Sequence, residues 1–264
     1  LFSNALSAVV GGVGGGEGGA GGAVTVNHSG DITVLGQGAM AIKAESINGG
    51  GGTLTFDLSG IVGLPGVPVV GNGGPEAPID PVVSARLGGQ GGSNMNANKV
   101  AVNSSGTFGA GGENGAAVFI QSVGGGGGTI NLYAELGLGT DEIADQSAAP
   151  VQFDLALGGA GGESNRGGDI ASSHTGDVVT NGQNTIGVLV QSIGGGGGRL
   201  IADVDVPAGA RIGDVTVRLG GAAGVNEQGG DLVRNQSGDL VTTGDYAPAT
   251  LLQSIGGGGG VAQV

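Results

Sequence analysis

The carboxylates that could perform catalysis or bind a metal recur at one position. Asp31, Asp177 and Asp239 each follow a glycine and precede a hydrophobic residue, and Thr107 takes the place in one copy. Carboxylates on neighbouring segments could cleave a polysaccharide by acid–base catalysis or bind calcium. An aspartate after glycine also caps a turn without either role, and the calcium-binding nonapeptide does not occur in series. We predict structural carboxylates, no catalytic residue, no metal site and no cofactor.

The two histidines also share one position. His28 and His174 align with Ser104 and Gln236 of the other copies. A catalytic histidine needs its own setting and a partner residue. Because serine and glutamine take the same place, we predict interchangeable polar turn residues rather than an enzyme's base.

Asparagines recur in register one residue before the histidine position. Asn27, Asn103 and Asn235 lie in Asn-x-Ser sequons, and Ser173 replaces the asparagine in the remaining copy. In-register asparagines favour a stacked amide ladder or a turn over a glycosylation site. Glycine patterns that resemble phosphate loops arise here from composition alone, since no Gly-Lys-Ser/Thr occurs.

Composition indicates an ordered β-protein without an ordinary globular core. Of 264 residues, 66 are glycine and 3% are aromatic, yet 38% are hydrophobic, mostly aliphatic and alanine. The formal charge of −14 argues against nucleic acid and anionic membranes as partners. No apolar run suits a membrane-spanning helix, so no membrane insertion is expected. The sequence begins at Leu1 without methionine, as a processed or excised fragment would.

The elements that position these residues belong to an internal repeat. Three segments align without a gap over 42 residues, and a fourth fits the same register; the blocks span 11–52, 87–128, 157–198 and 219–260. Separators of 34, 28 and 20 residues lie between them, at 53–86, 129–156 and 199–218. Stacked coils must match in length, whereas loops that leave the stack need not. Residues 1–264 are therefore predicted to form a single repeat domain.

Four kinds of residue recur at fixed places in the block. They are a turn glycine, a serine, the glutamine before that serine, and the first glycine of a five-glycine run. We predict structural roles for all of them: Gly30, Gly106, Gly176 and Gly238; Ser46, Ser122, Ser192 and Ser254; Gln121, Gln191 and Gln253; Gly124, Gly194 and Gly256.

Apolar residues alternate with period two, as in Val118/Ile120 and Val188/Val190, which indicates strands. We predict an all-β fold: a parallel β-solenoid (β-helix) of stacked coils with glycine-rich corners and variable outward loops. The shortest period would then hold about three coils of some 20 residues, each rising about 4.8 Å. Prolines in the longest separator support an outward loop, because a central strand tolerates proline poorly. They are Pro65, Pro68, Pro75, Pro78 and Pro81.

The five-glycine run directly follows the last strand of every block. Residues without a Cβ can turn sharply or let another backbone lie unusually close. We predict a tight corner or an extended segment packed against neighbouring backbone. A flexible linker is the alternative, although a linker does not need the fixed register around it.

These strings resemble a known family. Gln191-Ser192-Ile193 and Gln253-Ser254-Ile255, each followed by five glycines, are similar to the glycine-rich repeats of large autotransporter proteins of Gram-negative bacteria. The resemblance covers the four blocks but little of the separators. It implies a passenger region exported through an outer-membrane β-barrel, commonly a right-handed parallel β-helix that serves adhesion or surface architecture.

We therefore expect a secreted, non-enzymatic structural or adhesive protein on the bacterial outer surface or in the extracellular matrix. It would form a stiff rod or filament by self-association. A second hypothesis is an adhesin whose separator loops bind a cell-surface or matrix ligand. A third, a β-helical polysaccharide-degrading enzyme, would depend on single aspartates.

Overall fold

The computed structural model describes residues 5–10, 19, 21–57, 82–88, 96–135, 151–158, 165–205, 212–220 and 226–263. Within these ranges the chain forms twenty strands and no helix, which confirms the all-β prediction. The strands are arranged as four successive coils of five strands each.

The bounds of the strands follow the repeat. The first coil contains β1 (Ala5–Val10), β2 (Val24–Ser29), β3 (Ile32–Val34), β4 (Met40–Ile47) and β5 (Gly51–Asp57). The second contains β6 (Val82–Leu87), β7 (Val100–Ser105), β8 (Phe108–Ala110), β9 (Ala116–Val123) and β10 (Gly127–Glu135). The third contains β11 (Val151–Leu157), β12 (Ile170–Thr175), β13 (Val178–Thr180), β14 (Ile186–Ile193) and β15 (Gly197–Asp205). The fourth contains β16 (Ile212–Leu219), β17 (Leu232–Ser237), β18 (Leu240–Thr242), β19 (Thr250–Ile255) and β20 (Gly259–Gln263).

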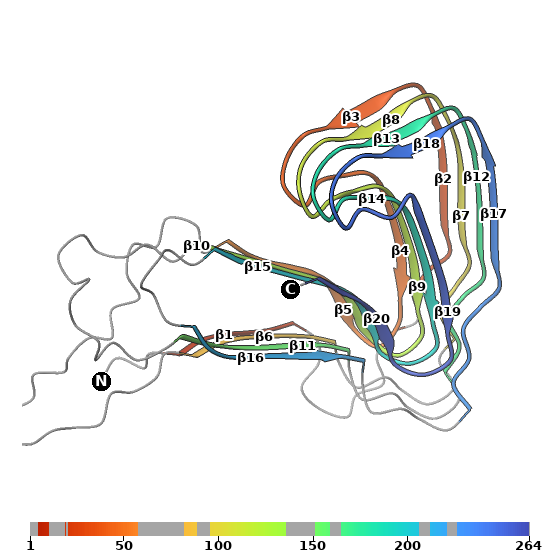
Figure 1. Ribbon diagram of the computed structural model, residues 1–264. Coiled ribbons are helices and arrows are strands. Elements are labelled where there is room, and N and C mark those ends of the chain that lie inside the picture. The colour runs from red at the N-terminus through yellow and green to blue at the C-terminus, as the bar shows by residue number, and fades with distance from the viewer. Residues whose placement is uncertain are drawn as a thin grey trace, which may run out of the picture.

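Each strand pairs in parallel with its equivalent in the next coil, which gives five four-stranded sheets (Figure 1). Asn27 pairs with Asn103, for example, and Gln191 with Gln253. The chain is thus a parallel β-solenoid, as predicted. The expected coil size was wrong, however: one repeat forms one large coil rather than three coils of about 20 residues. Alternation identifies strands but does not show which strands pair, because every strand of a stack alternates alike.

The separators contribute two of the five sheets and are more than outward loops. Strands β5, β10 and β15 run into them, and β6, β11 and β16 leave them, each paired in parallel with its neighbours. The register shifts once, between Val151 and Phe153 in the pairing of β11 with β16. Only residues 58–81, 136–150 and 206–211 of the separators, with all five prolines of the longest one, lie outside the described residues. The ends of β10 and β15 and the starts of β6, β11 and β16 lie at the same side of the stack (Figure 1).

Three apolar clusters hold the sheets together. The first fills the space between the sheets of β7, β8 and β9 and their equivalents, around Phe108, Val118 and Ile120. The second lies between the sheets of β6 and β10, around Leu132 and Phe153. The third, with Phe119 and Leu189, packs on the other face of the β9 sheet. The β9 and β14 strands are consequently buried on both faces, which stabilises the centre of the cross-section.

The five-glycine run forms the corner between the β9 and β10 sheets, as predicted. Gly124, Gly125 and Gly126 make the bend, and the last two glycines begin the next strand, where Gly127 pairs with Gly197. A Cβ on Gly127 would overlap the carbonyl oxygen of Gly197, and a Cβ on Gly197 would overlap that of Gly259. Close approach of backbones between coils therefore requires glycine here, and a flexible linker is not what the structure shows.

Candidate functional site: the hydroxyl network between coils

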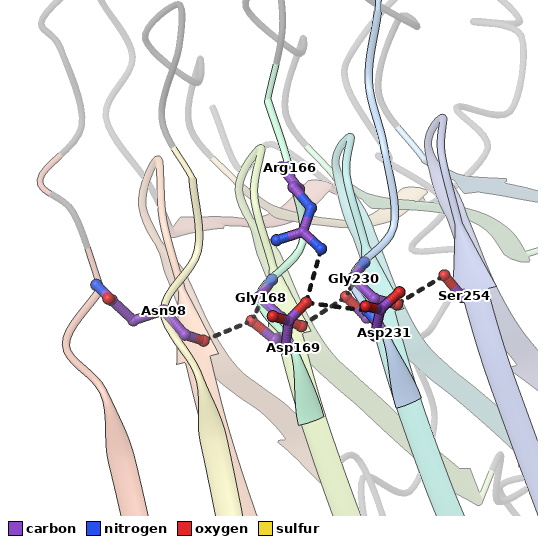
Figure 2. A network of polar contacts seen from close by, with 9 residues as sticks. Asn98, Arg166, Gly168, Asp169, Gly230, Asp231 and Ser254 are labelled. Atoms are coloured by element: carbon purple, nitrogen blue, oxygen red, sulfur yellow. Dashed lines mark hydrogen bonds and ion pairs between the residues drawn. The ribbon is translucent and has the colours of Figure 1, made fainter. Parts of the chain in front are cut away.

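The recurring serines lie at the ends of β4, β9, β14 and β19, beside the short segment that leads into the first strand of the block. In that segment Gly22, Asn98, Gly168 and Gly230 are equivalent positions (Figure 2 labels the last three). Each serine hydroxyl donates to the carbonyl of its own coil at this position. The pairs are Ser46–Gly22 at 3.0 Å, Ser122–Asn98 at 3.0 Å, Ser192–Gly168 at 2.9 Å and Ser254–Gly230 at 2.9 Å.

Two of these hydroxyls also accept a hydrogen bond from the following coil. The N–H of Gly168 donates to Ser122 Oγ at 3.0 Å, and the N–H of Gly230 donates to Ser192 Oγ at 2.8 Å. Ser192 is fully buried, so its hydroxyl satisfies two backbone groups that water does not reach. The serine hydroxyl thus links two segments of its own coil and also links that coil to the next one.

An aspartate extends this network in the third coil (Figure 2). Asp169 Oδ1 accepts from Arg166 Nη2 at 2.7 Å and from the N–H of Asp231, one coil further, at 3.0 Å. The Asp231 N–H lowers the pKa of the Asp169 carboxyl, Arg166 lowers it further, and burial opposes both. The carboxylate therefore stays ionised and acts as a backbone acceptor between coils.

The aspartates after the turn glycine do the same at another place. Asp31 Oδ1 accepts from the N–H of Thr107 at 2.7 Å, and Asp177 Oδ1 accepts from the N–H of Asp239 at 2.9 Å. Each carboxylate caps the equivalent turn of the next coil, in keeping with the predicted structural role. Thr107 has no carboxylate, which explains why the ladder of caps is interrupted in the second coil.

The turn glycines separate the first two strands of each block. Gly30, Gly106, Gly176 and Gly238 have φ values of 122°, 116°, 131° and 117°, a region that disfavours side chains. A Cβ on Gly106, Gly176 or Gly238 would also overlap the carbonyl oxygen of the equivalent glycine in the preceding coil. Conformation and close stacking both require glycine.

The glutamines form a column along the third strand of the block. Gln191 Nε2 donates to Gln253 Oε1 at 2.7 Å, and Gln121 Nε2 donates to the carbonyl of Gly128 at 3.3 Å. Glu45 replaces glutamine in the first coil and forms an ion pair with Lys43 at 3.0 Å. Gly124, Gly194 and Gly256, the first glycines of the runs, directly follow these strands and begin the corner; Gly124 N–H donates to Ile193 O and Gly194 N–H to Ile255 O, both at 2.8 Å.

The histidines lie within strands β2 and β12, so their assignment to a turn was wrong. Residue 28 and its equivalents share the inward-facing side of their strands with Val100 and Ile170. The ring of His174 packs on that of Phe108 with centroids 4.4 Å apart, and Ser104 Oγ lies 2.9 Å from His174 Nδ1. Burial lowers the pKa of His174, with a further contribution from the nearby charge of Arg234.

The sequon residues form a ladder on the outward side of the same strands. Asn103 Nδ2 donates to Asn27 Oδ1 at 3.2 Å, and Ser173 Oγ donates to Asn103 Oδ1 at 2.8 Å. The shared register of these side chains is what the in-register sequons predicted. In both pairs the later coil donates to the coil before it.

One buried charge was missed in the sequence. Arg199 on β15 is fully buried, and its Nη2 donates to the carbonyls of Asn114 at 2.8 Å and Gly115 at 3.1 Å and to Gln263 Oε1 at 3.0 Å. Burial lowers the pKa of Arg199 to about 10. The aligned positions of the other coils are Thr53, Thr129 and Val261, so no repeat signal marks this arginine.

The described ranges contain no cluster of three or more histidine or acidic residues that could hold a metal. They also contain no helix with the length and hydropathy needed to cross a bilayer. No family model, curated protein or solved structure matches the chain.

Proposed function

We propose that this chain is a stiff, load-bearing segment of an extracellular bacterial surface protein. The observation that supports this function is the register of the stack, in which all five strands of a coil pair with equivalents in the next coil. To remove one coil, the ladders of five sheets must break together, in addition to the serine and aspartate bonds. Such a stack resists bending and proteolysis without any catalytic site.

Single-molecule pulling tests the load-bearing function. Coils that unfold one at a time release 62 to 76 residues each, or about 220 to 270 Å of chain per rupture. A sawtooth with that spacing is expected. Gradual lengthening at low force would contradict the proposal.

A matched pair of variants sharpens this test. Gly197→Ala places a Cβ against the carbonyl of Gly259 and should lower the force of the rupture between the third and fourth coils. Thr25→Ala on the exposed side of β2 is the control and should leave every rupture force unchanged.

Protease treatment of intact cells that make the full-length protein tests the surface location, since a cytoplasmic protein would be spared.

A second candidate function is ligand binding through the separators. It is favoured by the position of the described strand ends: β5, β10 and β15 end, and β6, β11 and β16 begin, at one shared side of the stack (Figure 1). A deletion that tests it should stay within residues 58–81, because Val82 already belongs to β6. Loss of binding to matrix or host cells with an unchanged melting transition would support an adhesin, and unchanged binding would exclude this region.

A further inference from the structure

The contacts that recur in every coil do not determine which coils become neighbours. The same strands, turn glycines and serines lie at equivalent places in each coil, so their ladders could form between any two coils. An order in which the third and fourth coils exchange places, the exchanged order, would also stack four coils. We infer that side chains which do not recur determine the order of the coils. This inference goes beyond the proposed function, because it concerns how a repetitive chain selects one stack.

An aspartate of the third coil lies between two arginines of its neighbours. Asp154 on β11 forms ion pairs with Arg86 of the second coil at 3.7 Å and with Arg218 of the fourth coil at 3.1 Å. The two arginines occupy one position of the register, since both pair with Ala156.

The exchanged order would make the second and fourth coils neighbours. Arg86 and Arg218 would then lie directly opposite each other, about 4.8 Å apart along the stack. Like charges directly opposite destabilise a sheet. Exposed ion pairs contribute little to stability, but here attraction in one order and repulsion in the other distinguish two stacks that are otherwise alike.

The turns of the first two coils provide a second distinction. Asp203 Oδ2, on β15 of the third coil, accepts from Asn114 Nδ2 of the second coil at 2.8 Å and from Gln37 Nε2 of the first at 2.6 Å. In the fourth coil Tyr246 occupies the position of Asn114 and has no amide. In the exchanged order Asp203 would lose Asn114 as a neighbour and lie one coil further from Gln37.

The inward side of β12 and β17 provides a third distinction. Arg234 Nη1 of the fourth coil donates to Ser172 Oγ of the third at 2.7 Å. The equivalent residue of the second coil is Val102, which offers no side-chain acceptor. The exchanged order would place Val102 on the side where the half-buried guanidinium now finds Ser172, and a buried charge without a partner is costly. All three contacts thus favour the third coil between the second and the fourth.

Pairs of introduced cysteines report the order directly, because the chain has no cysteine of its own. Ala101, Ala171 and Val233 occupy one position on the outward side of β7, β12 and β17. A disulfide requires Cα atoms within about 7 Å of each other. Ala101→Cys can therefore join Ala171→Cys in the native order, whereas it can join Val233→Cys only when the second and fourth coils are neighbours.

A charge variant tests the inference on this reporter. Each cysteine pair is introduced separately, the chain is refolded at low concentration and oxidised, and mass spectrometry without reduction measures the disulfide. Arg218→Asp places a carboxylate beside Asp154 in the native order and opposite Arg86 in the exchanged order. It should raise the disulfide between positions 101 and 233 at least about tenfold, and added salt should reduce that rise.

The matched control reverses all three charges. Arg86→Asp, Asp154→Arg and Arg218→Asp together restore the alternation, so the disulfide between positions 101 and 233 should stay at the level of the chain that carries only the cysteines. Ser192→Ala is a second control, because it removes a contact of the recurring kind and should weaken the stack without changing its order.

Three results would overturn the inference. They are an unchanged disulfide between positions 101 and 233 in Arg218→Asp, an equal rise in the variant with all three charges reversed, and an equal rise in Ser192→Ala, since instability alone would then explain the wrong order. Asp154→Ala removes both ion pairs without adding a like charge and should give a smaller rise. If Arg218→Asp does not fold, the absence of any rise in Asp154→Ala overturns the inference.

Discussion

Removal of one serine hydroxyl should destabilise the stack by an amount that depends on the coil. Ser192→Ala deletes the acceptor of the Gly230 N–H and the donor to the Gly168 carbonyl, both of which are buried. A buried group left without a partner costs about 1 to 3 kcal/mol. Two such groups predict a loss of about 3 kcal/mol in the free energy of unfolding.

The equivalent change in the fourth coil is the matched control. Ser254 donates to the Gly230 carbonyl and accepts no N–H from a following coil, so Ser254→Ala should cost about 1 kcal/mol. Ser122→Ala should lie between the two, because it frees the buried Gly168 N–H but an exposed carbonyl at Asn98. Guanidinium denaturation followed by circular dichroism, at protein concentrations where the chain is monomeric, measures the series.

Hydrogen exchange at a single amide tests the cause. In Ser192→Ala the Gly230 N–H loses its acceptor and should exchange at least about tenfold faster, whereas in Ser254→Ala the same amide keeps its bond to Ser192. Two results would refute the role of the Ser192 hydroxyl as a hydrogen-bond link between the third and fourth coils. One is an equal loss of stability in the two variants, and the other is unchanged protection of the Gly230 amide in Ser192→Ala.

Three other perturbations follow from buried groups. Arg199→Met should change the free energy of unfolding by less than about 1 kcal/mol, because the charge no longer has to be buried and this gain offsets the lost hydrogen bonds. Arg199→Ala should cost about 3 kcal/mol, because it also leaves a cavity. Chemical denaturation of both variants measures the two changes. His174 has a lowered pKa, so the folded state binds fewer protons and stability should fall as pH drops below about 6.5; His174→Gln should remove that dependence in thermal melts. Gly127→Ala should lower the melting temperature by several degrees, because its Cβ overlaps backbone on the next coil, and an unchanged melt would mean that the corner can relax.

Much of the architecture could be read from the sequence because the fold repeats. The turn glycines, the serines and the glycine runs appear at fixed places within each block, and the structure uses them in contacts that recur from coil to coil. The path of the coil could not be read, since the alternation of Val118 and Ile120 specifies a strand without its partner. Arg199 was missed for a related reason: it occurs once, and its buried environment comes from a turn at residues 114 and 115 far away in the sequence.

The equality of repeat and coil has a consequence for how such a protein can change its length. When a whole period is added or lost, every remaining strand still meets an equivalent strand, so the cross-section and its contacts are preserved. The stack then grows or shrinks by one strand spacing, about 4.8 Å. Recombination between similar gene segments could therefore change the length of the stack in small steps that preserve its contacts. An insertion of any other size would have to be accommodated where β5, β10 and β15 end.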